Sequence, residues 1–196
     1  MGTGAGRVNP KWDETDEAGR WLADELDQRS TVGAAVPRRY PLCVEIPRTR
    51  VQYPELVEAT EGSGVVRAAV LVDALEHLTK GQICHFAVWE GWGYFGRRAT
   101  RLAYDIPSEG ILLIPHQQMR YHLWSGPVSE FSTFAREWTD PSFVWPEDRR
   151  WCLGSSVDST ATYLGGDNAV AAAVLGAPEL DARIVDRSAE QAFPDR

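Results

Sequence analysis

The sequence predicts an α+β fold: a single domain with a mostly antiparallel sheet and three to four helices. Short apolar runs bounded by glycine, proline or polar residues outnumber the helical patterns and do not alternate regularly with them. A chain of 196 residues with 43% hydrophobic and 24% charged content is ordinary for one globular domain with a sizeable core. Its eight tryptophans indicate a core or groove built largely from large rings.

The first part of the chain is expected to hold one helix and one strand. Residues 1–11 are predicted to be a flexible segment, and residues 12–186 to form the domain. An acidic helix is predicted from Asp13 to Gln28, because acids in its first turn complement the helix dipole. Leu42 to Ile46 lies between two prolines, which is typical of a strand at a sheet border.

Apolar periodicity predicts most of the remaining elements. Val65 to Thr79 repeats at helical spacing and is followed by Gly81, a residue that commonly ends helices. A second helix is expected after Ser125-Gly-Pro, and Asp167 is expected to cap a third that ends at Leu175. Strands are predicted at residues 83–89, 111–114, 121–124, 143–145, 150–155, 161–164 and 182–185, with a polar loop from 115 to 120 and a frayed tail at 187–196.

Charge and cysteine content restrict the partners and the compartment. The net charge of −8 and the pI near 5.0 disfavour direct binding to nucleic acid, which usually needs a basic face. No apolar run approaches the ~20 residues of a membrane helix, and the N-terminus lacks the apolar region of a secretory signal. Cys43, Cys84 and Cys152 are odd in number and scattered, which favours reduced thiols in a cytoplasm. A cytoplasmic protein without membrane contact is expected, and its oligomeric state is left open.

The segment 86–96, Phe-Ala-Val-Trp-Glu-Gly-Trp-Gly-Tyr-Phe-Gly, interleaves aromatic residues with glycines. This pattern predicts a strand that runs into a tight turn with aromatic walls. Gly91 to Gly96 also matches G-x-G-x-x-G, but no βαβ unit follows, so a structural turn is favoured over a nucleotide loop and no cofactor is predicted. Since Trp, Tyr and Arg often anchor interfaces, the turn is a candidate binding surface. The predicted binding residues are Trp89, Glu90, Trp92, Tyr94, Phe95 and Arg97, with Arg149 and Asp158 from a later segment.

Signals for catalysis or metal binding are weak. The four histidines and Cys84 lack the tight paired spacing of zinc sites, and Cys84 and His85 must face opposite sides of a strand, so no metal is predicted. Several serines lie near Asp158 without a local histidine, although a distant histidine can approach in the fold. There is no G-x-S-x-G elbow, and Cys152 is expected to be buried and inert. Whether the protein is an enzyme is left open.

Three segments carry a resemblance to a known group of sequences. Phe-Ala-Val-Trp-Glu-Gly-Trp-Gly spans 86–93, Trp-Pro-Glu-Asp-Arg-Arg-Trp spans 145–151, and Thr-Tyr-Leu-Gly-Gly spans 162–166. They resemble the F-A-x-W-E-G-x-G, W-P-x-D-x-x-W and T-Y-x-G-G segments of a family of uncharacterised actinobacterial proteins. The resemblance covers residues 40–176 and implies no activity, because no function is established for that family.

Two hypotheses about function follow. The first is a cytoplasmic, non-enzymatic module that binds a protein or peptide through the aromatic, glycine-rich turn. An acidic protein of regulatory or immunity type, neutralising a basic partner, would suit the net charge. The alternative is a small-molecule enzyme or ligand-binding protein with a pocket between the turn and residues 148–158. There Glu90 or Asp158 would be the base and Arg97 or Arg149 would hold an anion, which requires Glu90 and Asp158 to converge.

Overall fold

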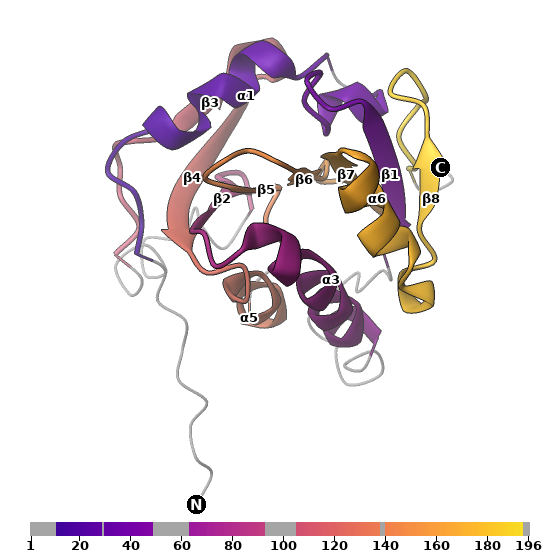
Figure 1. The fold of residues 1–196 in the computed structure, drawn as a ribbon. Coiled ribbons are helices and arrows are strands. Elements are labelled where there is room, and N and C mark those ends of the chain that lie inside the picture. The colour runs from indigo at the N-terminus through magenta and orange to yellow at the C-terminus, as the bar shows by residue number, and fades with distance from the viewer. Residues whose placement is uncertain (1–10, 29, 49–62, 93–104, 138–139, 194–196) are drawn as a thin grey trace, which may run out of the picture.

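A computed structural model describes residues 11–28, 30–48, 63–92, 105–137 and 140–193 (Figure 1). Its elements in chain order are η1 (Glu17–Gly19), α1 (Arg20–Glu25), η2 (Val32–Ala34), β1 (Leu42–Pro47), α3 (Ser63–Thr79), β2 (Cys84–Trp89), β3 (Leu112–Ile114), η4 (Pro115–Gln117), β4 (Met119–Gly126), α5 (Glu130–Glu137), β5 (Phe143–Pro146), β6 (Cys152–Gly154), β7 (Ala161–Gly166), α6 (Asn168–Leu175), η5 (Pro178–Leu180) and β8 (Arg183–Val185). The described residues thus form the predicted α+β fold. They contain four α-helices, and their strands overlap the predicted ones.

The strands form one eight-stranded sheet in the order β3-β4-β2-β5-β6-β7-β1-β8. Every neighbouring pair in this order is antiparallel. Helices α3, α5 and α6 cover one face of the sheet, while α1 and η2 lie on the other (Figure 1). The sheet therefore has an apolar layer on each side.

Alternation along the strands divides the core into these two layers. Phe86 and Trp124 belong to the layer between the sheet and the helices α3, α5 and α6. Trp145 belongs to the layer between the sheet and α1. Because successive strand residues point to opposite faces, Cys84 lies in the first layer and its neighbour His85 faces the second, as predicted. Of the seven described tryptophans, four are buried (Trp21, Trp124, Trp145 and Trp151) and three are half-buried (Trp12, Trp89 and Trp92).

Local capping chemistry explains the start of α6. The Asp167 side chain accepts a hydrogen bond from the Val170 amide at 3.0 Å, which confirms the predicted N-cap. That bond, more than the nearby Arg150 guanidinium, holds the pKa of Asp167 below its usual value. Within the described ranges, no helix has both the length and the apolarity that crossing a bilayer requires.

The predicted helix from Asp13 to Gln28 is wrong in its first half. Trp12 forms an isolated antiparallel bridge with Trp124, and the Asp13 amide donates to the Leu123 carbonyl at 2.8 Å. The short strand β3 leaves this part of the β4 edge open, so residues 12 and 13 extend along it and satisfy its backbone groups. Helical structure begins only at η1, and α1 ends at Glu25.

The expectation of a frayed tail from residue 187 is also wrong for the described part, up to residue 193. Arg187 donates to the Asp27 carboxylate and to the carbonyls of Glu25, Gly33 and Val36. Gln191 is buried and donates to the Thr31 carbonyl at 2.7 Å. These bonds tie the tail to residues 25–36, and both segments cover the sheet on the α1 side.

Candidate binding cavities at the two ends of the sheet

The aromatic turn begins where β2 ends. The Glu90 amide donates to the Arg120 carbonyl at 2.9 Å, which continues the pairing with β4 for one residue. A side chain on Gly91 would place its Cβ 2.1 Å from the indole of Trp89, so glycine is required for that ring to lie over the turn. Trp92 meets Trp89 edge to face with ring centres 6.0 Å apart. The described part of the turn is therefore tight and aromatic, as predicted.

A small cavity of about 270 Å³ lies beside the turn. Its lining residues are Trp89, Glu90, Gly91, Gln118 and Arg120. Glu90 accepts a hydrogen bond from Arg120 Nε at 2.7 Å, so its carboxylate is already engaged in an ion pair. Tyr94, Phe95 and Arg97 lie outside the described residues.

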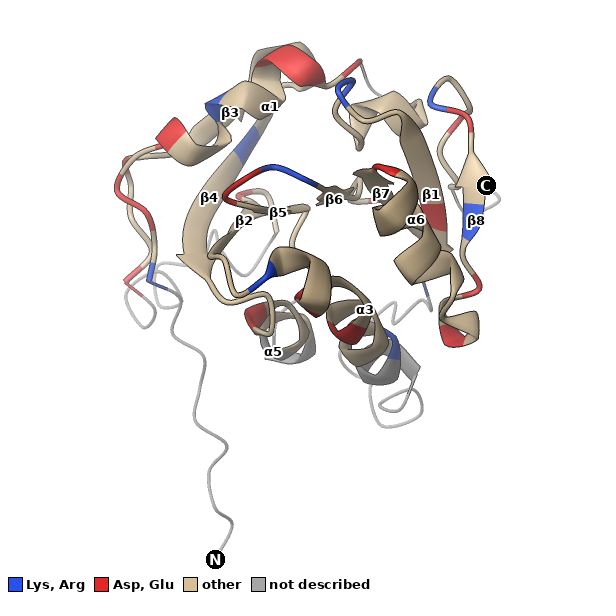
Figure 2. Ribbon diagram, in the orientation of Figure 1, with Lys and Arg blue, Asp and Glu red and all other residues tan. Residues whose placement is uncertain are grey.

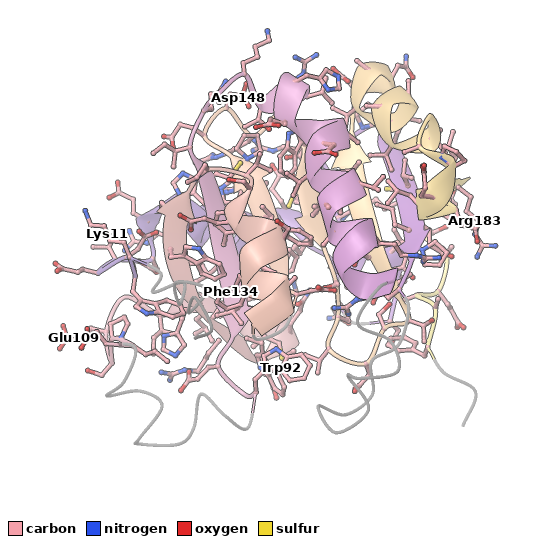
Figure 3. All side chains as sticks on the ribbon, turned by 90° about the horizontal axis from the view of Figure 1, so that it is seen from below. Lys11, Trp92, Glu109, Phe134, Asp148 and Arg183 are labelled. Atoms are coloured by element: carbon pink, nitrogen blue, oxygen red, sulfur yellow. The ribbon has the colours of Figure 1, made fainter. Side chains whose placement is uncertain are left out.

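Arg149 and Asp158 are not brought to this cavity. Arg149 lies in the turn between β5 and β6, beside the start of β2, whereas the aromatic turn follows the end of β2. Figure 3 shows Asp148 and Trp92 at opposite ends of the sheet. Asp158 is exposed in the connection after β6, and it lines neither of the two cavities described in this section. Neither cavity is lined by both Glu90 and Asp158, so neither is the shared pocket that was expected for these two residues.

A larger cavity, of about 490 Å³, lies at the end of the sheet where β2 begins. We refer to it as the acid-lined cavity. Its lining residues are Asp13, Glu14, Thr15, Glu17, Ala18, His85, Ser125, Trp145, Glu147 and Arg149. The segment before α1 supplies one wall, and β2, β4, β5 and the turn after β5 supply the other.

Four lining side chains form one chain of hydrogen bonds. Ser125 Oγ lies 3.1 and 3.2 Å from the two carboxylate oxygens of Asp13 and 2.9 Å from Nδ1 of His85. The other ring nitrogen of His85, Nε2, lies 2.6 Å from Oε2 of Glu147. The sheet register creates this chain, because His85 stands directly opposite Ser125 on β4 and Trp145 on β5. The imidazole stacks on the Trp145 indole with ring centres 5.6 Å apart, which fixes its plane.

The cavity is strongly acidic, with Glu14 and Glu17 exposed at its rim. In Figure 2 the acidic positions of the segment before α1 and of α1, coloured red on the ribbon, lie on the same side of the sheet. Arg149 is the one arginine or lysine among the described lining residues. Its guanidinium lies over the Trp21 ring, 5.1 Å from the ring centre, and its carbonyl accepts from the Tyr40 hydroxyl at 2.8 Å. These contacts with Trp21 and Tyr40 hold Arg149 in the lining of the acid-lined cavity.

Burial of the Asp13 carboxyl raises its pKa, against the smaller opposing effects of the Ser125 hydrogen bond and of the charges on His85 and Lys11. Ionised Asp13 therefore lowers stability at neutral pH, and protonation relieves this as the pH falls. We expect Asp13→Asn, which keeps an oxygen that can accept from Ser125, to raise the free energy of unfolding at about pH 7 by up to ~1 kcal/mol. Urea unfolding measures this effect, and the gain should disappear at about pH 3.

Asp16 provides a control of opposite sign. Its hydrogen bond from Arg20 holds the pKa of Asp16 below its usual value. Asp16→Asn should lower stability at neutral pH, and the difference should vanish at low pH. A loss of stability at neutral pH in Asp13→Asn as well would contradict the account given for Asp13.

The sequence alone did not identify this group of residues. In the sequence His85 is a candidate metal ligand only, and Ser125 and Asp13 mark only the predicted starts of helices. The described residues hold no group of three or more His, Cys, Asp or Glu placed to bind a metal ion. Cys84 lies on the other face of the sheet, where burial raises the pKa of its thiol to about 12. Burial also raises the pKa of Cys152, which is fully buried, as predicted.

Comparisons with protein-family models, with curated proteins and with solved structures find no match to this chain. The function of the site is therefore inferred from its own geometry and charge.

Proposed function

We propose that this protein is a binding module that accepts a lysine or arginine side chain of a protein or peptide partner in the acid-lined cavity. The observation that carries the proposal is the set of four carboxylates around one cavity, those of Asp13, Glu14, Glu17 and Glu147. Charge-assisted hydrogen bonds from a cationic donor to such carboxylates are among the stronger polar contacts in proteins. Arg149, the one arginine or lysine among the described lining residues, does not balance them.

The dimensions and the field of the protein support the same partner. A volume of about 490 Å³ lies within the usual range of ligand sites and accommodates one long basic side chain. The net charge of −8 attracts a basic partner from a distance and so raises the association rate at low salt. The proposed module acts in the cytoplasm, where the buried free thiols of Cys43, Cys84 and Cys152 stay reduced. Trp89 and Trp92 at the aromatic turn remain a separate prediction for a second contact surface.

A pair of matched peptides tests the proposal. A hexapeptide of arginine and its uncharged citrulline counterpart differ in charge but hardly in shape. We expect the arginine peptide to shift the amide resonances of residues around His85 and Ser125 in a saturable NMR titration, and the citrulline peptide to leave them unchanged. Raising the salt concentration should weaken the interaction.

Two double variants with the same change in charge show whether the cavity is responsible. Glu14→Gln/Glu17→Gln removes two carboxylates from the rim, and we expect the dissociation constant for the arginine peptide to rise about tenfold. Asp73→Asn/Glu179→Gln removes two exposed carboxylates from the helical side of the sheet, so its dissociation constant should stay within about twofold of wild type. Equal losses in the two double variants would show that only the net charge matters.

A further inference from the structure

Ser125, His85 and Glu147 come from three different places in the chain and meet in one wall of the acid-lined cavity. Ser125 lies on β4, His85 lies on β2, and Glu147 directly follows β5. The two hydrogen bonds that join them, of 2.9 and 2.6 Å, are within the range expected between a nucleophile, its base and the group that orients the base. We propose that this set is a nucleophilic serine site that hydrolyses carboxylic esters.

The proton on the imidazole decides what Ser125 can do. When His85 is neutral and Glu147 is ionised, Nε2 must carry the ring proton, because a bare nitrogen 2.6 Å from a carboxylate oxygen would be repelled. Nδ1 then has only a lone pair. The hydroxyl of Ser125, 2.9 Å away, is the donor that the geometry offers to it. Glu147 is thus a positioning residue, which selects the ring form in which His85 acts as a base.

Asp13 competes for the same hydroxyl proton, but its two oxygens are farther away, at 3.1 and 3.2 Å. Once His85 has taken the serine proton, the imidazolium has the Glu147 carboxylate at Nε2 and the Asp13 carboxylate on the far side of Ser125. Both then stabilise the positive charge that forms on the ring. Asp13 therefore opposes the proton transfer before attack and favours the state that follows it.

The remaining parts of the site suit an acyl transfer. Stacking on Trp145 holds the imidazole plane, so the base keeps its orientation toward Ser125. Arg149 supplies a positive charge at the same cavity for the oxyanion that develops on the substrate carbonyl. The backbone of Arg149 has a φ of 53°, a left-handed conformation that is uncommon for residues other than glycine. Such strained positions cluster at functional sites.

The reaction needs no redox partner. Ser125 Oγ forms a bond to the ester carbonyl carbon while its proton passes to Nδ1 of His85, and the bond to the leaving alcohol breaks as the alcohol takes that proton. Water then attacks the acyl-enzyme, gives its proton to His85 and releases the carboxylic acid, while His85 returns the proton to Ser125. A preference for esters that carry a cationic group rests on the proposed function; the nucleophilic serine does not.

An uncharged fluorophosphonate, which reacts covalently with activated serines, tests the nucleophile without relying on cation binding. We expect it to label Ser125 in the wild-type protein, as located by peptide mass mapping. Ser188 is an internal control, because this exposed hydroxyl bonds to the Asp186 carboxylate without a described histidine partner. Labelling of Ser125 no faster than that of Ser188 would overturn the proposal, while binding of the arginine peptide would still support the binding module.

Two variants distinguish a catalytic role of these hydrogen bonds from a purely structural one, in which they only hold the segment before α1 against the sheet. In His85→Asn we expect labelling of Ser125 to be about a hundredfold slower than in the wild-type protein, because the base that takes the hydroxyl proton is lost. Glu147→Gln should also slow labelling at least about tenfold, because the amide can donate to Nε2 and reverse the ring form. Its melting temperature should stay close to wild type, since the Glu147 side chain is 69% exposed. Unchanged labelling in folded His85→Asn would refute the role of the base.

Discussion

Trp124→Ala is expected to lower the free energy of unfolding by about 3–5 kcal/mol, the range for removing a fully buried large aromatic side chain. The Trp124 side chain is 0% exposed in the core beneath the long helices. It stacks on Phe86 with ring centres 4.8 Å apart and contacts Phe134 in a tilted arrangement with ring centres 4.4 Å apart. Its removal would leave a cavity joining β4, β2 and α5, so both a transfer cost and a packing cost follow. Urea unfolding followed by circular dichroism measures the loss.

Trp124→Phe separates the packing from the polar contact of the indole. Nε1 of Trp124 donates to Glu130 at 3.2 Å, and this bond partly offsets the burial that raises the pKa of the Glu130 carboxyl. Trp124→Phe should therefore cost less than Trp124→Ala and should raise the pKa of Glu130 further. Adding Glu130→Gln should recover part of the loss at neutral pH. If Trp124→Phe costs as much as Trp124→Ala, the indole hydrogen bond and not the packing dominates.

Elements with strong local signals could be predicted from the sequence. The 17-residue helix α3 follows from the apolar spacing between Val65 and Thr79, and α6 follows from Asp167, whose side chain bonds within the same turn. Most strands were predicted to within a few residues because each is a short apolar run between turn residues. In each of these cases the sequence signal that predicts the element lies within the element or directly beside it.

Elements decided by distant contacts could not be predicted. The acids after Trp12 favour a helix locally, but the open edge of β4, more than a hundred residues away in the chain, holds Trp12 and Asp13 in an extended conformation. The tail is polar and reads as frayed, yet Arg187 satisfies carbonyl groups near η2 that are about 150 residues distant. Neither pairing leaves a periodic trace in the sequence.

The acid-lined cavity depends on the same long-range information. His85 and Ser125 are 40 residues apart, and only the register between β2 and β4 places them opposite each other. The aromatic turn, where aromatic residues and glycines are densest in the sequence, lies at the other end of β2. Arg149 is a predicted binding residue, but its position over the ring of Trp21 depends on where α1 packs, which the sequence does not show. The segment with the densest sequence motif is therefore not the one that forms the acid-lined cavity.

Gly154→Ala is expected to cost at least about 3 kcal/mol, at the upper end for overpacking, and to disrupt the α1 side of the molecule. A Cβ on Gly154 would stand 1.8 Å from the carbonyl oxygen of Ala35 and 2.8 Å from its carbon. Both obstacles are backbone atoms, so no rotamer change relieves the clash, and the segment that carries Ala35 must leave β6. The tail fastened to that segment through Arg187 should be released with it.

Hydrogen exchange can follow this release residue by residue. In Gly154→Ala the amides of Val32, Gly33 and Gln191, which are bonded between the tail and the η2 segment, should lose protection before those of α3. Gly176→Ala is the matched control, since Gly176 has a φ of −74° and the nearest atom to its added Cβ lies 3.1 Å away. That control should stay within about 1 kcal/mol of wild type. Equal stability of the two variants would mean that the η2 segment can move away from β6 at little cost. The contact between Gly154 and Ala35 would then not hold that segment against the sheet.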